Sequence, residues 1–125
     1  MKTTLSLSGG KDSTFLLLEL IRRGTPPDEC VFFDTGWEFP QMYRHMDRLR
    51  ALCEENGIEF TVLHPAKSFD YLMFEKPVRE KTGGTHCGYS WCGARGIRWG
   101  TTEKTKALAQ HNQDSIDLIV LAADE

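Results

Sequence analysis

The fold is decided near the N-terminus by the stretch Leu5-Ser6-Leu7-Ser8-Gly9-Gly10-Lys11-Asp12-Ser13-Thr14-Phe15. An apolar strand runs here into two glycines, a lysine, an aspartate and two hydroxyl residues, and then into an apolar helix. Both glycines can take positive φ and let the backbone come close to a ligand. The helix, predicted to begin near Ser13, directs its free N–H groups and its positive dipole end at the same place. The stretch therefore predicts a phosphate-binding turn.

Charged and hydroxyl side chains complete this turn. Lys11 adds a positive charge, and Ser8, Ser13 and Thr14 add hydroxyl groups. The spacing of the glycines is neither that of Walker A nor that of G-x-G-x-x-G. A Gly-Gly pair also occurs in ordinary strand-to-helix connections, but here every fixed position of S-G-G-x-D-S is filled. The stretch resembles the PP-loop of the N-type ATP pyrophosphatases and the PAPS reductases.

Strand and helix patterns alternate along the rest of the chain. We predict strands over residues 3–8, 30–33, 58–63 and 116–122, and helices over 13–23, 40–56, 69–74 and 102–111, with 76–100 irregular. Near-continuous apolar strands separated by helices favour an α/β fold with a parallel sheet of about four strands and flanking helices. Ligands bind such sheets at the carboxyl ends of the strands. These ends carry Ser8-Gly9-Gly10, Asp34-Thr35-Gly36, His64-Pro65 and Ala123-Asp124.

The composition indicates one soluble globular domain over residues 1–125, with 40% hydrophobic and 26% charged residues. The sequence contains no apolar run of ~18 residues and no signal region, so we expect a cytoplasmic protein without a membrane segment. The four cysteines are then expected to be thiols or ligands. The net charge of −3 does not indicate nucleic-acid binding. Residues 79–106 are locally basic, which predicts either a solvated face or a surface for an anionic, ring-containing ligand.

A second segment strengthens the resemblance to the PAPS reductases. Their D-T-G-x-x-F-P-E-T-Y segment is similar to Val31-Phe32-Phe33-Asp34-Thr35-Gly36-Trp37-Glu38-Phe39-Pro40-Gln41-Met42-Tyr43. Arg98-Trp99-Gly100-Thr101, followed by Lys104, is similar to the R-W-C-T…K stretch that closes over the nucleotide, with Gly100 in place of the cysteine. A weaker match covers residues 122–125. The resemblance implies a Rossmann-like domain of the adenine nucleotide alpha hydrolase type.

The resemblance also implies a function. It implies binding of ATP or PAPS, with Mg²⁺, and attack on the α-phosphate of ATP with release of pyrophosphate. It assigns catalytic roles to Lys11, Asp12 and Arg98, and nucleotide binding to Ser8, Gly9, Gly10, Lys11, Asp12, Ser13, Thr14, Asp34, Thr35, Gly36 and Lys104. We expect no resident metal site, because His86, Cys87 and Cys92 have a looser spacing than structural zinc requires.

Two alternatives stay open. The chain is either a PAPS reductase-like enzyme that needs a missing tail or a partner's thiol, or a non-catalytic nucleotide-binding subunit of a larger assembly. Family reductases carry a nucleophilic cysteine in an E-C-G-x-H tail, and the iron–sulfur enzymes carry a Cys-Cys pair and a C-x-x-C. This sequence contains none of these, so we expect neither an iron–sulfur cluster nor reductase activity by this chain alone.

The last predicted strand bears on the size of the domain. It is followed by few residues, so the chain stops one or two elements short of the five strands that the resemblance implies. Either the domain lacks a C-terminal portion, or a partner completes it. We also expect a homo-oligomer or a protein partner that covers the edge of this strand.

Overall fold

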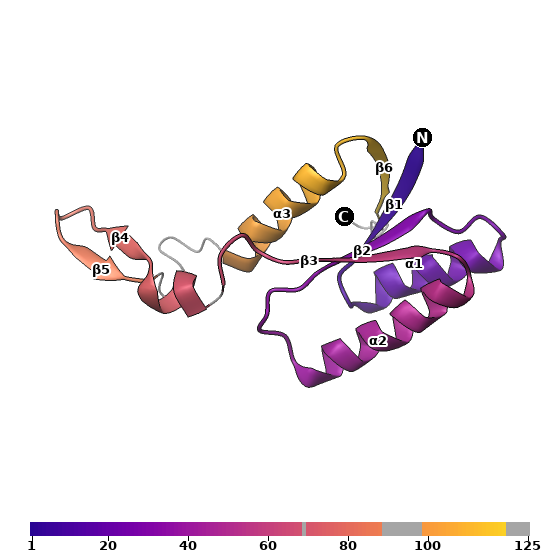
Figure 1. Ribbon diagram of the computed structural model, residues 1–125, viewed down its shortest axis with the longest axis horizontal. Coiled ribbons are helices and arrows are strands. Elements are labelled where there is room, and N and C mark those ends of the chain that lie inside the picture. The colour runs from indigo at the N-terminus through magenta and orange to yellow at the C-terminus, as the bar shows by residue number, and fades with distance from the viewer. Residues whose placement is uncertain (69, 89–98, 120–125) are drawn as a thin grey trace.

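The structure is a computed structural model that describes residues 1–68, 70–88 and 99–119, with the backbone alone for 99–103. In chain order its elements are β1 (Lys2–Leu7), α1 (Lys11–Arg22), β2 (Glu29–Phe33), α2 (Pro40–Glu55), β3 (Glu59–Leu63), the π-helix η1 (Tyr71–Glu75), β4 (Pro77–Arg79), β5 (Thr85–Cys87), α3 (Trp99–His111) and β6 (Ser115–Leu118) (Figure 1).

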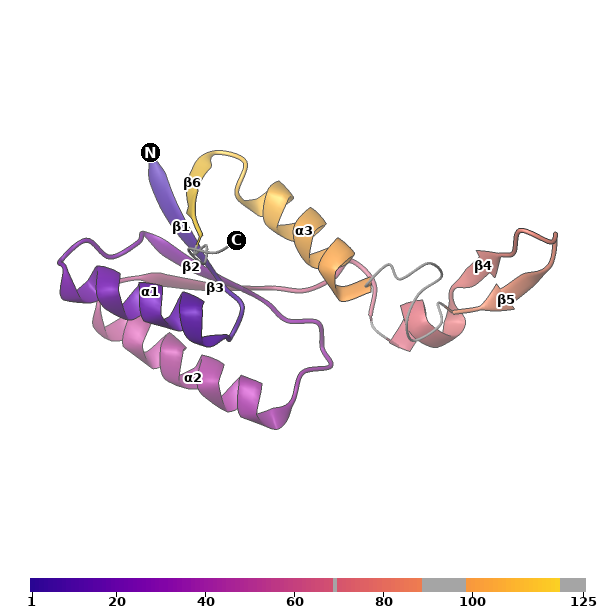
Figure 2. The same ribbon diagram turned by 180° about the vertical axis from the view of Figure 1, so that it is seen from behind.

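The main sheet is parallel and has the strand order β3-β2-β1-β6, which confirms the predicted α/β fold. The helices α1 and α2 lie on one face of the sheet, because β1, β2 and β3 advance in one direction through right-handed crossovers. The helix α3 lies on the opposite face, because β6 pairs with the other side of β1 (Figures 1 and 2). The strand order therefore reverses between β1 and β6. The phosphate loop (residues 8–14) follows β1 at this switch point, where such sheets bind ligands.

The face of the sheet under α1 and α2 is apolar. Side chains alternate along each strand, so every second residue points to this side. The core cluster there comprises Leu5, Leu7, Leu17, Cys30, Phe32, Met46, Leu49, Cys53 and Ile58. Cys30 and Cys53 are buried in this core as free thiols.

The helix α1 is apolar on most sides, but it is buried on one side only. Only Ser13 and Leu17 are buried on this helix, whereas Phe15 and Leu18 are 65% and 48% exposed. The helix meets the sheet on one side only, and α2 lies beside it rather than over its outer face (Figure 1).

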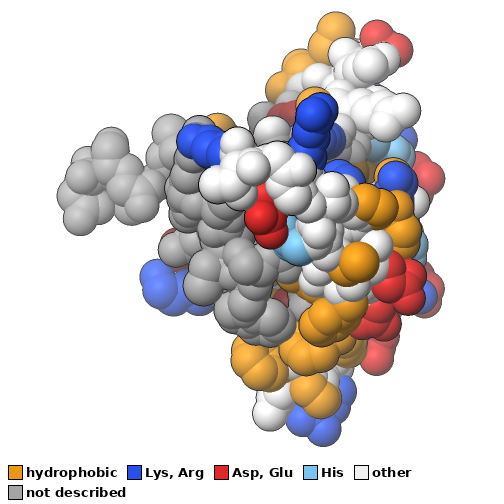
Figure 3. Space-filling view, turned by 90° about the vertical axis from the view of Figure 1, so that its left-hand side faces the viewer, with side chains coloured by type: hydrophobic (Ala, Val, Ile, Leu, Met, Phe, Trp, Pro, Cys, Tyr) orange, Lys and Arg blue, Asp and Glu red, His pale blue; other side chains and the backbone are white. Residues whose placement is uncertain are grey.

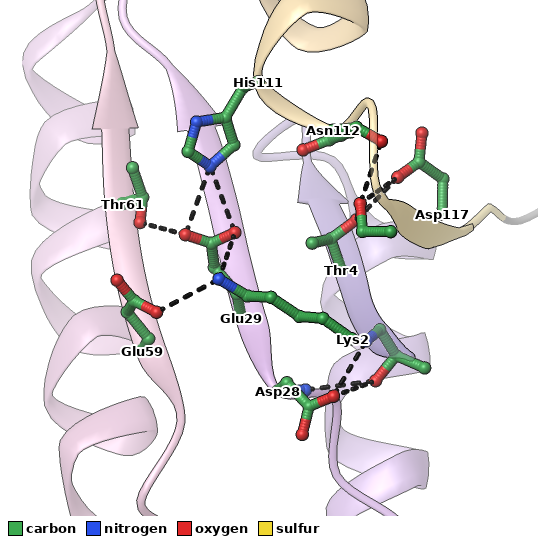
Figure 4. Close-up of polar contacts among 11 residues, drawn as sticks. Lys2, Thr4, Asp28, Glu29, Glu59, Thr61, His111, Asn112 and Asp117 are labelled. Carbon is green, nitrogen blue, oxygen red and sulfur yellow. Dashed lines mark hydrogen bonds and ion pairs between the residues drawn. The ribbon is translucent and has the colours of Figure 1, made fainter.

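The opposite face of the sheet is polar near the amino ends of its strands (Figure 4). The Glu29 side chain is 2% exposed and accepts hydrogen bonds from Thr61 Oγ1 at 2.5 Å and from His111 Nε2 at 3.1 Å. Lys2 Nζ lies 3.4 Å from the same carboxylate. Burial alone would raise the pKa of Glu29, but the hydrogen bonds from Thr61 and His111 and the charges of His111 and Lys2 outweigh it and lower the pKa. This buried carboxylate therefore ties the end of α3 to β2 and β3.

A neighbouring pair of contacts joins β1 to β6. Thr4 Oγ1 donates to Asp117 Oδ1 at 2.6 Å and lies 3.4 Å from Ser115 Oγ (Figure 4). Since Thr4 is buried in β1, these bonds fix β6 in its register beside that strand.

Several predicted boundaries differ from the structure. The helix α1 begins at Lys11, two residues before the predicted start, and α3 begins at Trp99. The predicted strand 116–122 begins at Ser115, and residues 120–122 lie outside the described residues. The expected short helix at 69–74 is the π-helix η1.

The prediction that residues 76–100 are irregular is wrong for β4 and β5. These strands form an antiparallel hairpin that projects from the main sheet (Figures 1 and 2). The hairpin closes on η1 because the Gly88 N–H donates to the Lys76 carbonyl at 2.6 Å. A Cβ at Gly88 would lie 1.8 Å from the Met73 carbonyl oxygen, so only glycine fits there. No helix in the described part of the chain is both long and apolar enough to cross a bilayer.

Replacing Glu29 tests the polar face. We expect Glu29→Ala to destabilise the fold by ~2–3 kcal/mol, because it removes hydrogen bonds to a charged group and leaves buried donors without an acceptor. Because the folded pKa is lowered, the charge of Glu29 contributes stability that is complete above the ordinary value of 4.5 and is lost as the pH falls through the folded pKa. Urea unfolding of the wild type and Glu29→Gln from pH 7 to pH 3 measures this contribution. A stability difference that does not shrink below pH 4.5 would contradict it.

Candidate functional site

The backbone of the phosphate loop lies directly against α2. Gly9 has φ +85°, and a Cβ built there would lie 2.0 Å from Met42 Sδ and 3.2 Å from Met46 Cε. Glycine is therefore required at this position both for its conformation and for its lack of a side chain. Gly10 has φ −80° and ψ 172°, which is extended backbone, so of the two glycines only Gly9 uses positive φ. The close approach is made by Gly9 alone.

The hydroxyl groups of the loop bond mainly within the loop. The Ser8 N–H donates to Ser13 Oγ, and the Gly10 N–H donates to Ser8 Oγ, both at 3.3 Å. The Gly10 carbonyl accepts from Thr14 Oγ1 at 2.9 Å and from Ser13 Oγ at 3.4 Å. The sequence predicted these hydroxyls as ligand donors. In the structure they hold the shape of the loop.

The free donors of the loop are backbone groups. The N–H groups of Lys11, Asp12 and Ser13 form the first turn of α1 and make no hydrogen bond within the described residues. Lys11 Nζ contacts Asp12 Oδ1 at 3.0 Å, and the lysine side chain is 92% exposed. An exposed pair of this kind contributes little, so the ammonium can turn toward a ligand. The helix end and Lys11 together make a site for an anion.

An open pocket of about 380 Å³ lies beside these groups. It is lined by Gly9, Gly10, Lys11, Thr14, Phe15, Leu18 and His45. His45 comes from α2, and its Nε2 lies 3.0 Å from Thr14 Oγ1. The sequence analysis missed this residue. His45 lies in the sequence between Met42 and Met46, which pack on Gly9. Its contact with the loop can be recognised only once α1 and α2 are known to be neighbours.

The second predicted segment forms a structured loop after β2. Asp34 Oδ1 accepts from the Gly36 N–H and from the Tyr43 hydroxyl, each at 2.8 Å. Burial and the hydrogen bond to Asp34 raise the pKa of Tyr43. Thr35 Oγ1 donates to Glu38 Oε1 at 3.1 Å. Asp34 therefore supports its own loop and fastens it to α2.

A second pocket of about 270 Å³ opens beside this loop. Buried or partly buried apolar side chains line it together with charged ones: Phe32, Asp34, Tyr43, Met46, Asp47, Arg50, Phe60, Val62 and His64. The guanidinium of Arg50 stacks on the Phe60 ring at 5.2 Å. Because Leu7 pairs with Phe32, the loops that follow β1 and β2 are neighbours. The structure thus brings residues 8–14 and 34–36 to one edge of the sheet.

The rim of this edge is apolar. Trp37 and Phe39, in the loop before α2, are 59% and 79% exposed. Figure 3 shows hydrophobic side chains gathered on the lower part of one face of the molecule, where Figure 1 places the start of α2. Exposed aromatic side chains at this edge of the sheet suit a ligand that carries a ring.

One predicted residue is not brought to the phosphate loop, and a second lies outside the described residues. Lys104 lies on α3, on the other face of the sheet, and makes no hydrogen bond or ion pair with residues 8–14 in the described structure. Arg98 lies outside the described residues. Where side chains are described, no three His, Cys, Asp or Glu groups converge as metal ligands. His86 instead pairs with Glu80 at 3.1 Å, and Cys92 is not described.

Comparison with known families matches residues 2–114 to the phosphoadenosine phosphosulfate reductase domain. The chain belongs to this family. The family resemblance found in the sequence is thereby confirmed: the chain is a PAPS reductase-family domain with the adenine nucleotide alpha hydrolase-like fold.

Curated relatives give a second comparison. The PAPS reductase-family chain is 34% identical over 90 residues to the tRNA(Ile)-lysidine synthase of Chlamydia caviae, and 35% identical over 89 residues to that of Chlamydia abortus. The alignments cover 62% and 61% of this chain. The chain spans only 28% and 27% of the length of these relatives. No solved structure gives a significant match.

Alanine at each glycine of the loop tests its geometry. We expect Gly9→Ala to destabilise the fold by ~1–3 kcal/mol, because a side chain is strained at positive φ and meets Met42. Gly10→Ala is the matched control, since its backbone is extended and its nearest atom, Ser8 Oγ, would lie 3.5 Å away. Thermal unfolding of both variants checks this. Equal losses of stability would show that the loop does not have the described conformation.

Proposed function

We propose that this chain is a PP-loop domain that binds an adenine nucleotide at residues 8–14, with ATP pyrophosphatase (adenylating) chemistry. The observation that carries the proposal is the set of free N–H groups at the start of α1, beside the exposed Lys11 ammonium. Anions are favoured at a helix N-terminus by both the free donors and the dipole. The match to the phosphoadenosine phosphosulfate reductase domain supports a nucleotide that carries phosphate.

The two pockets suggest how one nucleotide would be divided between them. The pocket at the phosphate loop offers backbone donors and a cation, which suit the phosphates. The pocket after β2 offers the apolar surfaces of Phe32, Phe60 and Val62, which suit a base or ribose. Asp34 lies at its edge and holds the loop of Thr35 and Gly36. We therefore propose the nucleoside beside β2 and β3.

The chemistry proposed for ATP is displacement at its α-phosphate with pyrophosphate as the leaving group. Negative charge then grows on the departing pyrophosphate, where Lys11 and the N–H groups of α1 would stabilise it. Mg²⁺ favours hard carboxylate oxygens, and the second carboxylate oxygen of Asp12 has no partner among the described residues. We propose Asp12 as its ligand. Arg98 remains a proposed contact from the basic segment.

The nucleotide has two candidate identities. The family match favours a sulfonucleotide such as PAPS, and the two tRNA(Ile)-lysidine synthases, which are named for a synthetic reaction on tRNA, favour ATP with an acceptor. Since the chain spans less than a third of those relatives, we propose for it the nucleotide-binding step and leave the acceptor to the experiment. AMP and pyrophosphate formed from ATP would support the pyrophosphatase. Binding without turnover would favour a non-catalytic subunit.

Replacing Lys11 tests the phosphate site. We expect Lys11→Ala to weaken ATP and pyrophosphate binding about tenfold to a hundredfold, because each charge-assisted hydrogen bond lost contributes ~1.5–3 kcal/mol. The fold should be unaffected, since the side chain is exposed. Calorimetric titration of the wild type, Lys11→Ala and the matched variant Lys106→Ala, which removes an exposed lysine of α3, measures the effect. Equal affinities in all three would overturn the assignment of the phosphate loop.

Replacing Asp34 separates the nucleoside from the phosphates. We expect Asp34→Ala to weaken ATP binding about fivefold or more and to leave pyrophosphate binding nearly unchanged, because it frees the Gly36 N–H and Tyr43 hydroxyl. Asp34→Asn keeps an acceptor oxygen and should retain most of the affinity. Titrating ATP and pyrophosphate into each variant decides between the sites. An equal loss for both ligands would place Asp34 at the phosphates.

A further inference from the structure

A histidine of α2 is connected to the backbone of the phosphate loop. His45 Nε2 lies 3.0 Å from Thr14 Oγ1, and the Thr14 hydroxyl donates to the Gly10 carbonyl at 2.9 Å. A hydroxyl has one hydrogen, so the Thr14 oxygen must accept from His45 and Nε2 must carry a hydrogen. A continuous chain of donors thus runs from α2 through α1 to the loop.

This chain ends at the peptide group that matters for phosphate. The Gly10 carbonyl and the Lys11 N–H belong to one trans peptide, in which they point in opposite directions. Holding the carbonyl toward Thr14 turns the N–H away from α1, toward the pocket that Lys11 lines. Of the contacts to that carbonyl, the Thr14 hydroxyl is the shortest, since Ser13 Oγ and the Thr14 N–H both lie 3.4 Å away.

We propose that His45 is a positioning residue of the phosphate loop, which acts through Thr14 to fix the Gly10–Lys11 peptide in the orientation that binds phosphate. The inference rests on the proposed function, because it concerns the same ligand. A merely structural role is the competing explanation, since the contact also joins α1 to α2. If the role is structural, replacing His45 changes the stability of the protein. If His45 is a positioning residue, replacing it weakens phosphate binding even where the stability is unchanged.

Four variants separate the two roles. His45→Phe keeps the ring volume and removes the donor, and His45→Gln keeps an N–H donor near the position of Nε2. Thr14→Val removes the hydroxyl and keeps the shape, and His45→Phe/Thr14→Val completes a double-mutant cycle. Each is titrated with inorganic pyrophosphate and unfolded thermally alongside the wild type.

The relay predicts a specific pattern of affinities. We expect His45→Phe and Thr14→Val each to weaken pyrophosphate binding about fivefold, which is the size of one lost hydrogen bond. His45→Gln should stay within about twofold of the wild type, because a donor remains. The double variant should bind no more weakly than Thr14→Val, because His45 acts only through that hydroxyl. Losses that multiply, or a loss for His45→Gln as large as for His45→Phe, would overturn the relay.

The tautomer of His45 gives a readout that needs no ligand. Nitrogen-15 spectra of the histidine rings in the free wild-type protein should show hydrogen on Nε2 of His45, and a hydrogen on Nδ1 alone would overturn the relay. The titrations also separate this inference from the proposed function. A wild type that binds no pyrophosphate overturns the function, and the relay with it. If the wild type binds pyrophosphate, but no more tightly than His45→Phe binds it, the relay alone is overturned.

Discussion

The close approach of Gly9 to α2 is the constraint on which the rest of the site depends. Met42 and Met46 fill the space that a side chain at Gly9 would need, so the backbone at the end of β1 rests directly on α2. This contact brings the first turn of α1 next to the first turns of α2. His45 can then reach Thr14, and Met46 borders the pocket after β2 as well. The absence of a side chain at Gly9 thus determines how closely α1 and α2 approach each other, and with them the two pockets.

The two faces of the sheet hold their helices by different interactions. The apolar face under α1 and α2 holds the hydrophobic core cluster, and the loops that form the pockets follow the strands of this sheet. The opposite face holds α3 through the buried carboxylate of Glu29. This group accepts hydrogen bonds from Thr61 and His111 and pairs with Lys2. Such a carboxylate contributes through its partners, since an unpaired buried charge is costly. Because this network lies at the amino ends of the strands, it anchors α3 at the end of the sheet that is away from the phosphate loop.

The fold could be predicted because its signals are local and repeated. Strands with apolar residues such as Leu5, Leu7 and Phe32 alternate with segments of helical periodicity, and this order predicts a parallel α/β sheet. The Ser-Gly-Gly-Lys-Asp-Ser stretch marks the predicted phosphate turn. The hairpin of β4 and β5 was missed because its three-residue strands are too short to show an alternating pattern. His45 and Arg50 were missed because their roles arise from contacts between elements distant in sequence. Periodicity assigns a residue to a helix face, but it does not say what faces it.

The hydroxyl residues of the phosphate loop show how such a motif works physically. In the structure, Ser8, Ser13 and Thr14 satisfy the loop's own backbone, while the N–H groups of the first turn of α1 have no partner among the residues that the structure describes. A loop whose side chains are already bonded loses little freedom when a ligand arrives, so more of the interaction with phosphate appears as affinity. The serine and threonine positions of the motif are therefore best understood as preorganising the backbone. By the same argument, the residues that fix the threonine in turn, His45 first among them, belong to the site even though they need not touch the ligand.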